Sequence, residues 1–172
     1  GWNAMDKNSF AGVAELSALQ GYAAFAINYR LLKHQAYPAC YEDCLAAVSF
    51  FANTDYDLFQ ELDRTEVVVW GGSAGGHLAL MTGLTTQALS VKGIVSIAGP
   101  TDMRVQLTKG RFKELRFFDA DDITEEMKAA ASPVCHVHKD SPPLLCTHST
   151  TDELVEIAQA HALVKTYEEN GL

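Results

Sequence analysis

The stretch VVVWGGSAGGHLAL, from Val67 to Leu80, decides which fold class we expect for this chain. Four large apolar residues run directly into a cluster of four glycines that surrounds one serine, Ser73, and an apolar helical pattern follows. A short run of β-branched residues is typical of a strand that is buried on both faces. The stretch therefore predicts a strand over Thr65–Trp70, a sharp turn at Ser73 and a helix over His77–Leu84.

Strand patterns alternate with helical patterns along the rest of the chain. We expect further strands at Tyr22–Tyr29, Val91–Ala98 and Leu144–His148, and further helices at Ala11–Gln20, behind Pro38, at Thr124–Ala131 and at Leu154–Glu169. This alternation is typical of a mostly parallel sheet that is covered by helices on both faces. The 172 residues are predicted to form a single α/β domain, 1–172.

The composition argues against several classes of partner. The chain carries 22 acidic and 13 basic residues, a formal net charge of -9, so it would repel nucleic acid on average. No apolar run approaches the roughly 20 residues that span a membrane. No cysteine or histidine spacing suggests zinc, and we expect no metal or cofactor. The cysteines are predicted to be buried free thiols; they are Cys40, Cys44, Cys135 and Cys146.

The residues around Ser73 fit a nucleophile elbow. The segment Gly71-Gly72-Ser73-Ala74-Gly75 matches G-x-S-x-G, in which the serine occupies a strained turn between a strand and a helix. Small residues two positions before and after the serine, Gly71 and Gly75, would prevent a clash in this turn. The hydroxyl is then exposed at the carboxyl end of a parallel strand, and the following helix directs its N–H groups toward the same point. The alternative is a glycine-rich turn without chemistry.

A serine nucleophile needs a histidine base and an acid that orients the histidine. In a sheet of this kind the acid follows a later strand than the serine does, and the histidine comes last. Asp102 and Asp152 each follow an expected strand, and each could instead cap a helix. We interpret all the histidines as structural or surface residues, since none occurs in the required order; they are His34, His77, His136, His138, His148 and His161.

Taken in order, the motifs resemble those of one family. Similar motifs are H-G-G-G-W at Gly1-Trp2, N-Y-R-L at Asn28–Leu31, the elbow G-G-S-A-G-G-H-L at Gly71–Leu78, G-P-T-D at Gly99–Asp102, and H-G-x-x-D from His148 to Asp152. Over nearly its full length the chain resembles an internal piece of an α/β-hydrolase serine esterase, close to the bacterial carboxylesterases that include acetyl-xylan and feruloyl esterases. The resemblance implies an α/β-hydrolase fold that is incomplete at both ends, with residues 100–142 as a cap or pocket insertion.

The resemblance also assigns roles to single residues. It implies that Ser73 is the nucleophile, that Asp152 is the acid, and that the N–H of Ala74 is one oxyanion donor, while Gly1 matches a glycine that supplies another. The implied reaction is hydrolysis of short or aromatic acyl esters through an acyl-enzyme, including esters linked to plant polysaccharide. Three phenylalanines either line an aromatic acyl site or simply pack: Phe112, Phe117 and Phe118.

Alternative functions remain open at this point. They are a serine peptidase of the prolyl-oligopeptidase type, an arylformamidase, and a non-catalytic hydrolase-like binding protein. The sequence departs from the family pattern because Ser149 replaces a glycine and because the base histidine is not found. We therefore expect residues 1–172 alone to be poorly stable and inactive on p-nitrophenyl acetate, with the strand position between Tyr22–Tyr29 and Thr65–Trp70 filled from outside them.

Overall fold

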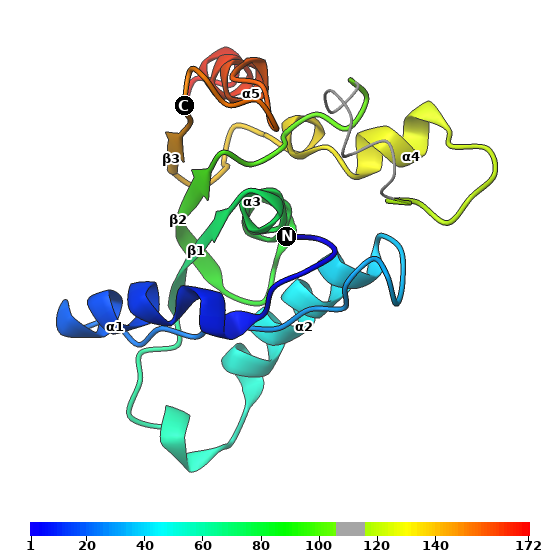
Figure 1. The fold of residues 1–172 in the computed structure, drawn as a ribbon. Coiled ribbons are helices and arrows are strands. Elements are labelled where there is room, and N and C mark those ends of the chain that lie inside the picture. The colour runs from blue at the N-terminus through cyan, green and yellow to red at the C-terminus, as the bar shows by residue number, and fades with distance from the viewer. Residues whose placement is uncertain (106–115) are drawn as a thin grey trace.

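A computed structural model describes residues 1–105 and 116–172, and its centre is a parallel sheet with helices on both sides (Figure 1). Within these residues the strands pair in the order β1 (Glu66–Gly72), β2 (Ser90–Ile97) and β3 (Leu144–Thr147). The α-helices are α1 (Ala11–Leu19), α2 (Ala39–Asn53), α3 (Ala74–Thr85), α4 (Glu125–Ala130) and α5 (Ala158–Glu169). The expected α/β class with a parallel sheet is confirmed.

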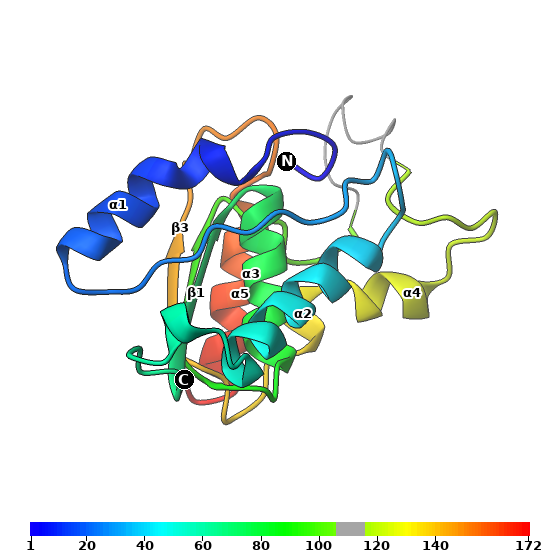
Figure 2. The ribbon, with the colours of Figure 1, turned by 90° about the horizontal axis from the view of Figure 1, so that it is seen from below.

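The helices lie in layers on the two faces of the sheet (Figure 2). Helix α1 lies on one face, and α3 and α5 lie on the other. Ile94 in β2 is fully buried, pairs with Leu144 in β3 and packs into one cluster with Leu80 of α3 and Leu163 of α5. The core of the described chain therefore lies between the sheet and these two helices.

The opposite face of the sheet is less covered than the sequence predicts. Val68 in β1 is 52% exposed, and Leu145 in β3 is 60% exposed. Side chains alternate between the faces of a strand, so these two point away from the buried Ile94 layer. Among the described residues, the expectation of helices over both faces thus holds only in part.

Helix α3 is the central helix of the fold. Apart from Gly75 and its last residue, Thr85, its residues are buried, so the helix is enclosed by other elements around nearly its whole circumference. It packs on β1 and β2 on one side and on α2 on the other. The Tyr41 hydroxyl of α2 lies 2.7 Å from the Thr85 hydroxyl at the end of α3. The two strands that end near Ser73, and helix α2, are thus positioned against this helix.

The strand expected at Tyr22–Tyr29 is not formed within the described residues. A strand requires a neighbour at ladder distance, and no described strand pairs with this segment. Side chains hold its downstream end instead: Asn28 Oδ1 accepts the N–H of Lys7 at 2.8 Å, and Asp43 Oδ2 accepts the N–H of Arg30 at 2.7 Å. The prediction of a strand here was wrong because the apolar pattern does not reveal whether a partner lies alongside.

The last helix begins later than the sequence predicts, at Ala158 rather than at Leu154. Asp152 Oδ1 accepts hydrogen bonds from the N–H groups of Leu154 and Val155, at 2.8 and 2.9 Å. These bonds close a local turn, and such a side-chain contact competes with helix formation. Asp152 therefore caps this turn, whereas the residue that precedes α5 makes no side-chain cap.

The cysteines are only partly as expected. Cys40 and Cys44 are buried one turn apart on α2, and all the cysteines are free thiols. Cys135 is exposed, and Cys146 is half-buried. The expectation of burial is therefore wrong for Cys135, which follows Pro133 in a short 3-10 turn rather than a strand or long helix.

Gly76 and Gly75 provide a direct test of the packing of α3. A Cβ on Gly76 would lie 2.9 Å from Ser96 Oγ and 3.0 Å from Gly99 Cα, whereas a Cβ on Gly75 would meet nothing within 4 Å. We predict that Gly76→Ala lowers the free energy of unfolding by about 1–3 kcal/mol through overpacking. Gly75→Ala, in the same turn, should leave it unchanged or raise it by up to about 1 kcal/mol. Urea unfolding of the full-length protein measures both, and equal losses would contradict the packing described.

Candidate active site

Ser73 forms the turn between β1 and α3. Its φ is 54° and its ψ is -122°, a conformation that residues with side chains rarely adopt. Its N–H donates to the Ile97 carbonyl at 2.7 Å, and its carbonyl accepts from the His77 N–H at 3.1 Å. The residue is exposed, and its hydroxyl does not cap the helix. The expected strand-to-helix turn with positive φ and an exposed serine is present.

Close contact between backbones explains the glycine before Ser73 but not the glycine after it. A Cβ on Gly71 would overlap the carbonyl group of Gly75, so only glycine fits at position 71. A Cβ on Gly75 would meet nothing within 4 Å, so the expected need for a small residue at position 75 is not found. A second close contact, between Gly76 and Gly99, was not predicted from the sequence. The doubled glycine after Ser73 was the available signal for it.

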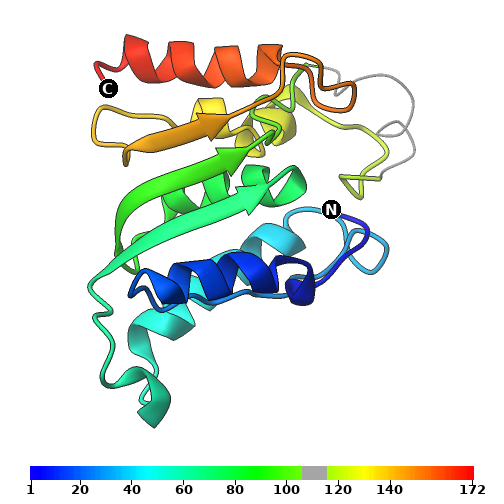
Figure 3. The ribbon, with the colours of Figure 1, turned by 60° about the vertical axis from the view of Figure 1, so that its left-hand side comes forward.

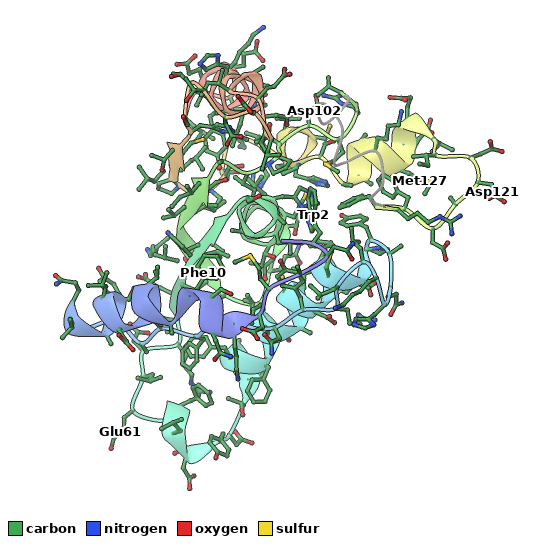
Figure 4. The ribbon with its side chains drawn as sticks, in the orientation of Figure 1. Trp2, Phe10, Glu61, Asp102, Asp121 and Met127 are labelled. Carbon is green, nitrogen blue, oxygen red and sulfur yellow. The ribbon has the colours of Figure 1, made fainter. Side chains whose placement is uncertain are left out.

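Of the residues expected to form the oxyanion hole, Ala74 lies at the beginning of α3, and Gly1 is connected to this helix through its neighbour Trp2. Ala74 is the first residue of the helix, and the first amides of a helix have no partners inside it. The Trp2 ring packs against the His77 ring of α3 at 5.2 Å (Figure 4). Tyr29 donates its hydroxyl to the Gly1 carbonyl at 3.1 Å. These contacts hold Gly1 beside the first turns of α3.

Asp152 lies in the loop that follows β3. Oδ1 of its carboxylate accepts the two backbone N–H groups of the turn, and its Oδ2 lies 3.7 Å from His148 Nε2. The N–H groups, that of Val155 most strongly, hold the pKa of Asp152 below its usual range. The side chain is 21% exposed. Asp152 is therefore an ionised carboxylate that is fixed through one oxygen and accessible to solvent.

The sheet brings Ser73 and Asp152 to the same edge. Beyond the paired strands, the Ser73 N–H bonds to Ile97 and the Ala98 N–H bonds to the Thr147 carbonyl at 2.8 Å. Ala98 also has a positive φ, 50°, which the sequence did not indicate. Figure 3 shows the strands ending at one side of the molecule, where the N-terminus also lies. At about 4.8 Å between neighbouring strands, the ends of β1 and β3 are roughly 10 Å apart, on either side of the end of β2.

Asp102 follows β2, but its carboxylate is committed to other groups. Its Oδ1 and Oδ2 each accept a guanidinium N–H of Arg104 at 2.8 Å, and Ser132 Oγ lies 3.4 Å from Oδ1. The guanidinium of Arg104 is the main cause that holds the pKa of Asp102 below its usual range. Gln159 of α5 binds the backbone N–H groups of Thr101 and Asp102, each at 2.7 Å. Asp102 therefore anchors the segment after β2 (Figure 4).

The histidines that contact the site elements use their rings in other bonds. His77 is fully buried, and its Nε2 lies 2.8 Å from the Ala131 carbonyl. His148 Nε2 lies 2.6 Å from the Val155 carbonyl, and His136 Nε2 lies 2.9 Å from the Ala130 carbonyl. Within residues 1–105 and 116–172, no histidine forms a hydrogen bond with Ser73. These contacts agree with the interpretation of the histidines as structural residues.

Comparison with known proteins places the chain in a family. Residues 1–167 match the family model BD-FAE. The chain belongs to the BD-FAE family. Esterase LipC from Mycobacterium tuberculosis is 32% identical over 174 residues, which cover 90% of this chain and 43% of LipC. The BD-FAE chain thus spans less than half the length of this curated relative.

Solved structures confirm the α/β-hydrolase fold of this BD-FAE chain. Thermogutta terrifontis esterase 2 phosphonylated by sarin matches with a TM-score of 0.80 and 21% identity, over 99% of this chain and 66% of that one. A bifunctional GH43-CE protein from Bacteroides eggerthii matches with a TM-score of 0.81 and 22% identity, over 99% of this chain and 26% of that one. At these identities the likeness shows the fold alone.

The described residues do not favour a reactive cysteine on α2 or a metal site. Burial raises the pKa of Cys40 to about 11 and that of Cys44 to about 12, so neither thiol is a reactive thiolate. In the part of the BD-FAE chain that the structure describes, no cluster of histidine, cysteine, aspartate or glutamate could hold a metal ion. The described helices are also too short or too polar to cross a membrane.

Of the phenylalanines expected at an aromatic acyl site, Phe117 and Phe118 lie among the described residues. Phe112 lies outside the described residues. Phe117 is buried, with its ring 4.9 Å from the rings of Trp2, Tyr37 and Phe118. Phe117 therefore belongs to the packing around the start of α3 and is not a free wall of a pocket.

Buried His77 should make the stability of this BD-FAE protein depend on pH. Burial lowers the pKa of His77 to about 4, from about 6.5 in an unfolded chain. A lowered folded-state pKa gives stability that is complete above pH 6.5 and is lost as the pH falls toward 4. We predict that the wild type loses about 2–3 kcal/mol more than His77→Gln between pH 7.5 and pH 4.5.

Urea unfolding at the two pH values measures this difference. The control is His161→Gln, because His161 is exposed on α5 and should follow the wild type. Parallel pH dependence of the wild type and His77→Gln would show that His77 accepts a proton without unfolding.

Proposed function

We propose that the protein is a serine carboxylic-ester hydrolase with Ser73 as its nucleophile. The observation that carries the proposal is the exposed Ser73 at positive φ, at the point where β1 turns into α3. Such a turn presents the hydroxyl beside the unpaired amides of a helix N-terminus, where negative charge is stabilised. Membership of the BD-FAE family and the likeness to esterase LipC support the same reaction.

In the proposed mechanism, Ser73 Oγ attacks the ester carbonyl carbon while a histidine accepts the hydroxyl proton. That histidine comes from outside residues 1–172. The N–H of Ala74 and the backbone at Gly1 bind the oxyanion. The intermediate collapses to an acyl-enzyme as the histidine returns the proton to the leaving alcohol. A water molecule then releases the acid and restores Ser73 by the same proton transfers.

Asp152 is proposed as the acid that orients the histidine. Its ionised carboxylate is fixed through Oδ1 and solvent-accessible, in the loop that follows the end of β3, and β3 runs parallel to β1. Asp102, the other candidate, is occupied by Arg104. The distinction is that both oxygens of Asp102 accept from a guanidinium, whereas Asp152 Oδ2 accepts no hydrogen bond within the described residues.

Short acyl esters are the proposed substrates. Thermogutta terrifontis esterase 2, a structural neighbour, is described with bound butyrate and with bound propionate. Another neighbour is a carbohydrate esterase from gut microbiota, so an ester carried by a polysaccharide is a further proposed substrate. We propose that residues 100–142 contribute to the pocket, as the resemblance to the esterase family implies.

The first test is labelling of Ser73. A fluorophosphonate probe should label the full-length wild type and not Ser73→Ala, and Ser73→Ala should lose ester hydrolysis of p-nitrophenyl acetate to background. Ser49, which is exposed on α2, supplies the control: Ser49→Ala should remain labelled and active. An unlabelled but folded wild type would point to a non-catalytic hydrolase-like protein, and a labelled protein that cleaves peptides but not esters would point to a peptidase.

The second test compares the two aspartates. Asp152→Asn should lower kcat by several orders of magnitude, because the histidine loses its orienting charge. Asp102→Asn should act mainly on stability, since it removes the partner of the Arg104 guanidinium. Steady-state kinetics and thermal unfolding of the two variants separate these effects, and comparable losses of kcat would count against Asp152 as the acid.

A further inference from the structure

The loop that carries Asp152 is closed by a buried histidine. His148 follows the last residue of β3, and its side chain is only 2% exposed. Its Nε2 lies 2.6 Å from the carbonyl of Val155, at the other end of the loop. One short hydrogen bond therefore joins the two ends of the segment 148–155.

Both the carbonyl and the N–H group of Val155 form hydrogen bonds within the loop. Its carbonyl accepts the bond from His148, and its N–H donates to Asp152 Oδ1 at 2.9 Å. The residue itself is buried. The orientation of the Asp152 carboxylate and the position of the His148 ring are thus linked through one buried residue.

The chemistry of the bond fixes the proton on the His148 ring. A carbonyl oxygen only accepts, so the proton lies on Nε2. Nδ1 is buried and has no hydrogen-bond partner within the described chain. The distance of 3.7 Å between Nε2 and Asp152 Oδ2 is too long for a hydrogen bond. His148 therefore acts on Asp152 through Val155 and leaves Oδ2 available.

We propose that His148 is a positioning residue that holds the Asp152 carboxylate, through Val155, in the orientation needed to direct the base histidine. This inference rests on the proposed function, in which Asp152 is the acid. A displacement of about 1 Å in a catalytic group can reduce turnover on the order of 100-fold, so the bond matters for rate as well as for folding.

The test compares two substitutions of His148. His148→Gln keeps an N–H donor near the place of Nε2, whereas His148→Leu fills similar space without a donor. Active sites are first titrated with a fluorophosphonate, so that kcat is calculated per active site and misfolded protein is not counted. We expect His148→Leu to lower kcat about 10- to 100-fold with KM changed less than about threefold, and His148→Gln to restore most of kcat. His161→Leu, on the exposed side of α5, should behave as the wild type.

A double-mutant cycle shows whether His148 acts through Asp152. In an Asp152→Asn background, His148→Leu should lower the residual kcat less than about twofold, because the carboxylate that it positions is gone. If His148→Leu gives no soluble protein, His148→Asn is used in its place. The asparagine side chain is too short for its amide to reach the Val155 carbonyl, so this variant also lacks the hydrogen bond.

Two results would overturn the proposal. The first is a donor-free variant with reduced thermal stability but unchanged kcat per titrated site. The second is a pair of losses that multiply in the double variant. By contrast, a wild type in which Ser73 is neither labelled nor needed for turnover would refute the proposed function, and the role of His148 with it.

Discussion

The contact between the backbones of Gly71 and Gly75 is the constraint on which the site depends. It brings the end of β1 and the first turn of α3 so close that no side chain fits at position 71. The chain reverses between them in a single residue, Ser73, which is held at φ 54°. This strain costs on the order of 1–3 kcal/mol and persists because β1 is paired along its length with β2 and α3 is buried.

Helix α3 connects that turn to the rest of the site. Three segments are attached to this buried helix by specific contacts. Gly76 packs on Gly99 at the end of β2, His77 binds the carbonyl of Ala131, and Trp2 packs on His77. The acid loop is separate from this helix and depends on its own bonds, from His148 and to Asp152. The proposed nucleophile and acid are thus supported by two independent sets of contacts.

The sequence was informative where structure is determined locally. The elbow at Ser73, the three strands at the centre and most of the helices follow from short patterns, and the structure contains them. The strand expected at Tyr22–Tyr29 failed because pairing depends on a neighbour that the pattern does not encode. The early start expected for α5 failed because the side chain of Asp152 captures the amides of the intended first turn.

Contacts between distant residues could not be predicted in the same way. His77 and its partner Ala131 are 54 positions apart, and Asp102 and Gln159 are 57 apart. Single-sequence patterns showed that His77 and Asp102 were candidates for structure or chemistry, but only the fold shows which bonds they form. The separation of Asp102 from Asp152 as candidate acids rests on Arg104, which is only two residues from Asp102, but the sequence does not show that its guanidinium turns back onto that carboxylate.

A crystal structure of the full-length protein after reaction with a phosphonate ester tests the central claim most directly. The adduct mimics the tetrahedral intermediate, so its phosphoryl oxygen marks the place of the oxyanion. We predict a covalent bond from phosphorus to Ser73 Oγ, with the phosphoryl oxygen within about 3.1 Å of the Ala74 nitrogen, and Asp152 Oδ2 bonded to the histidine beside the adduct. A phosphoryl oxygen directed away from α3, or an adduct on another residue, would contradict the account.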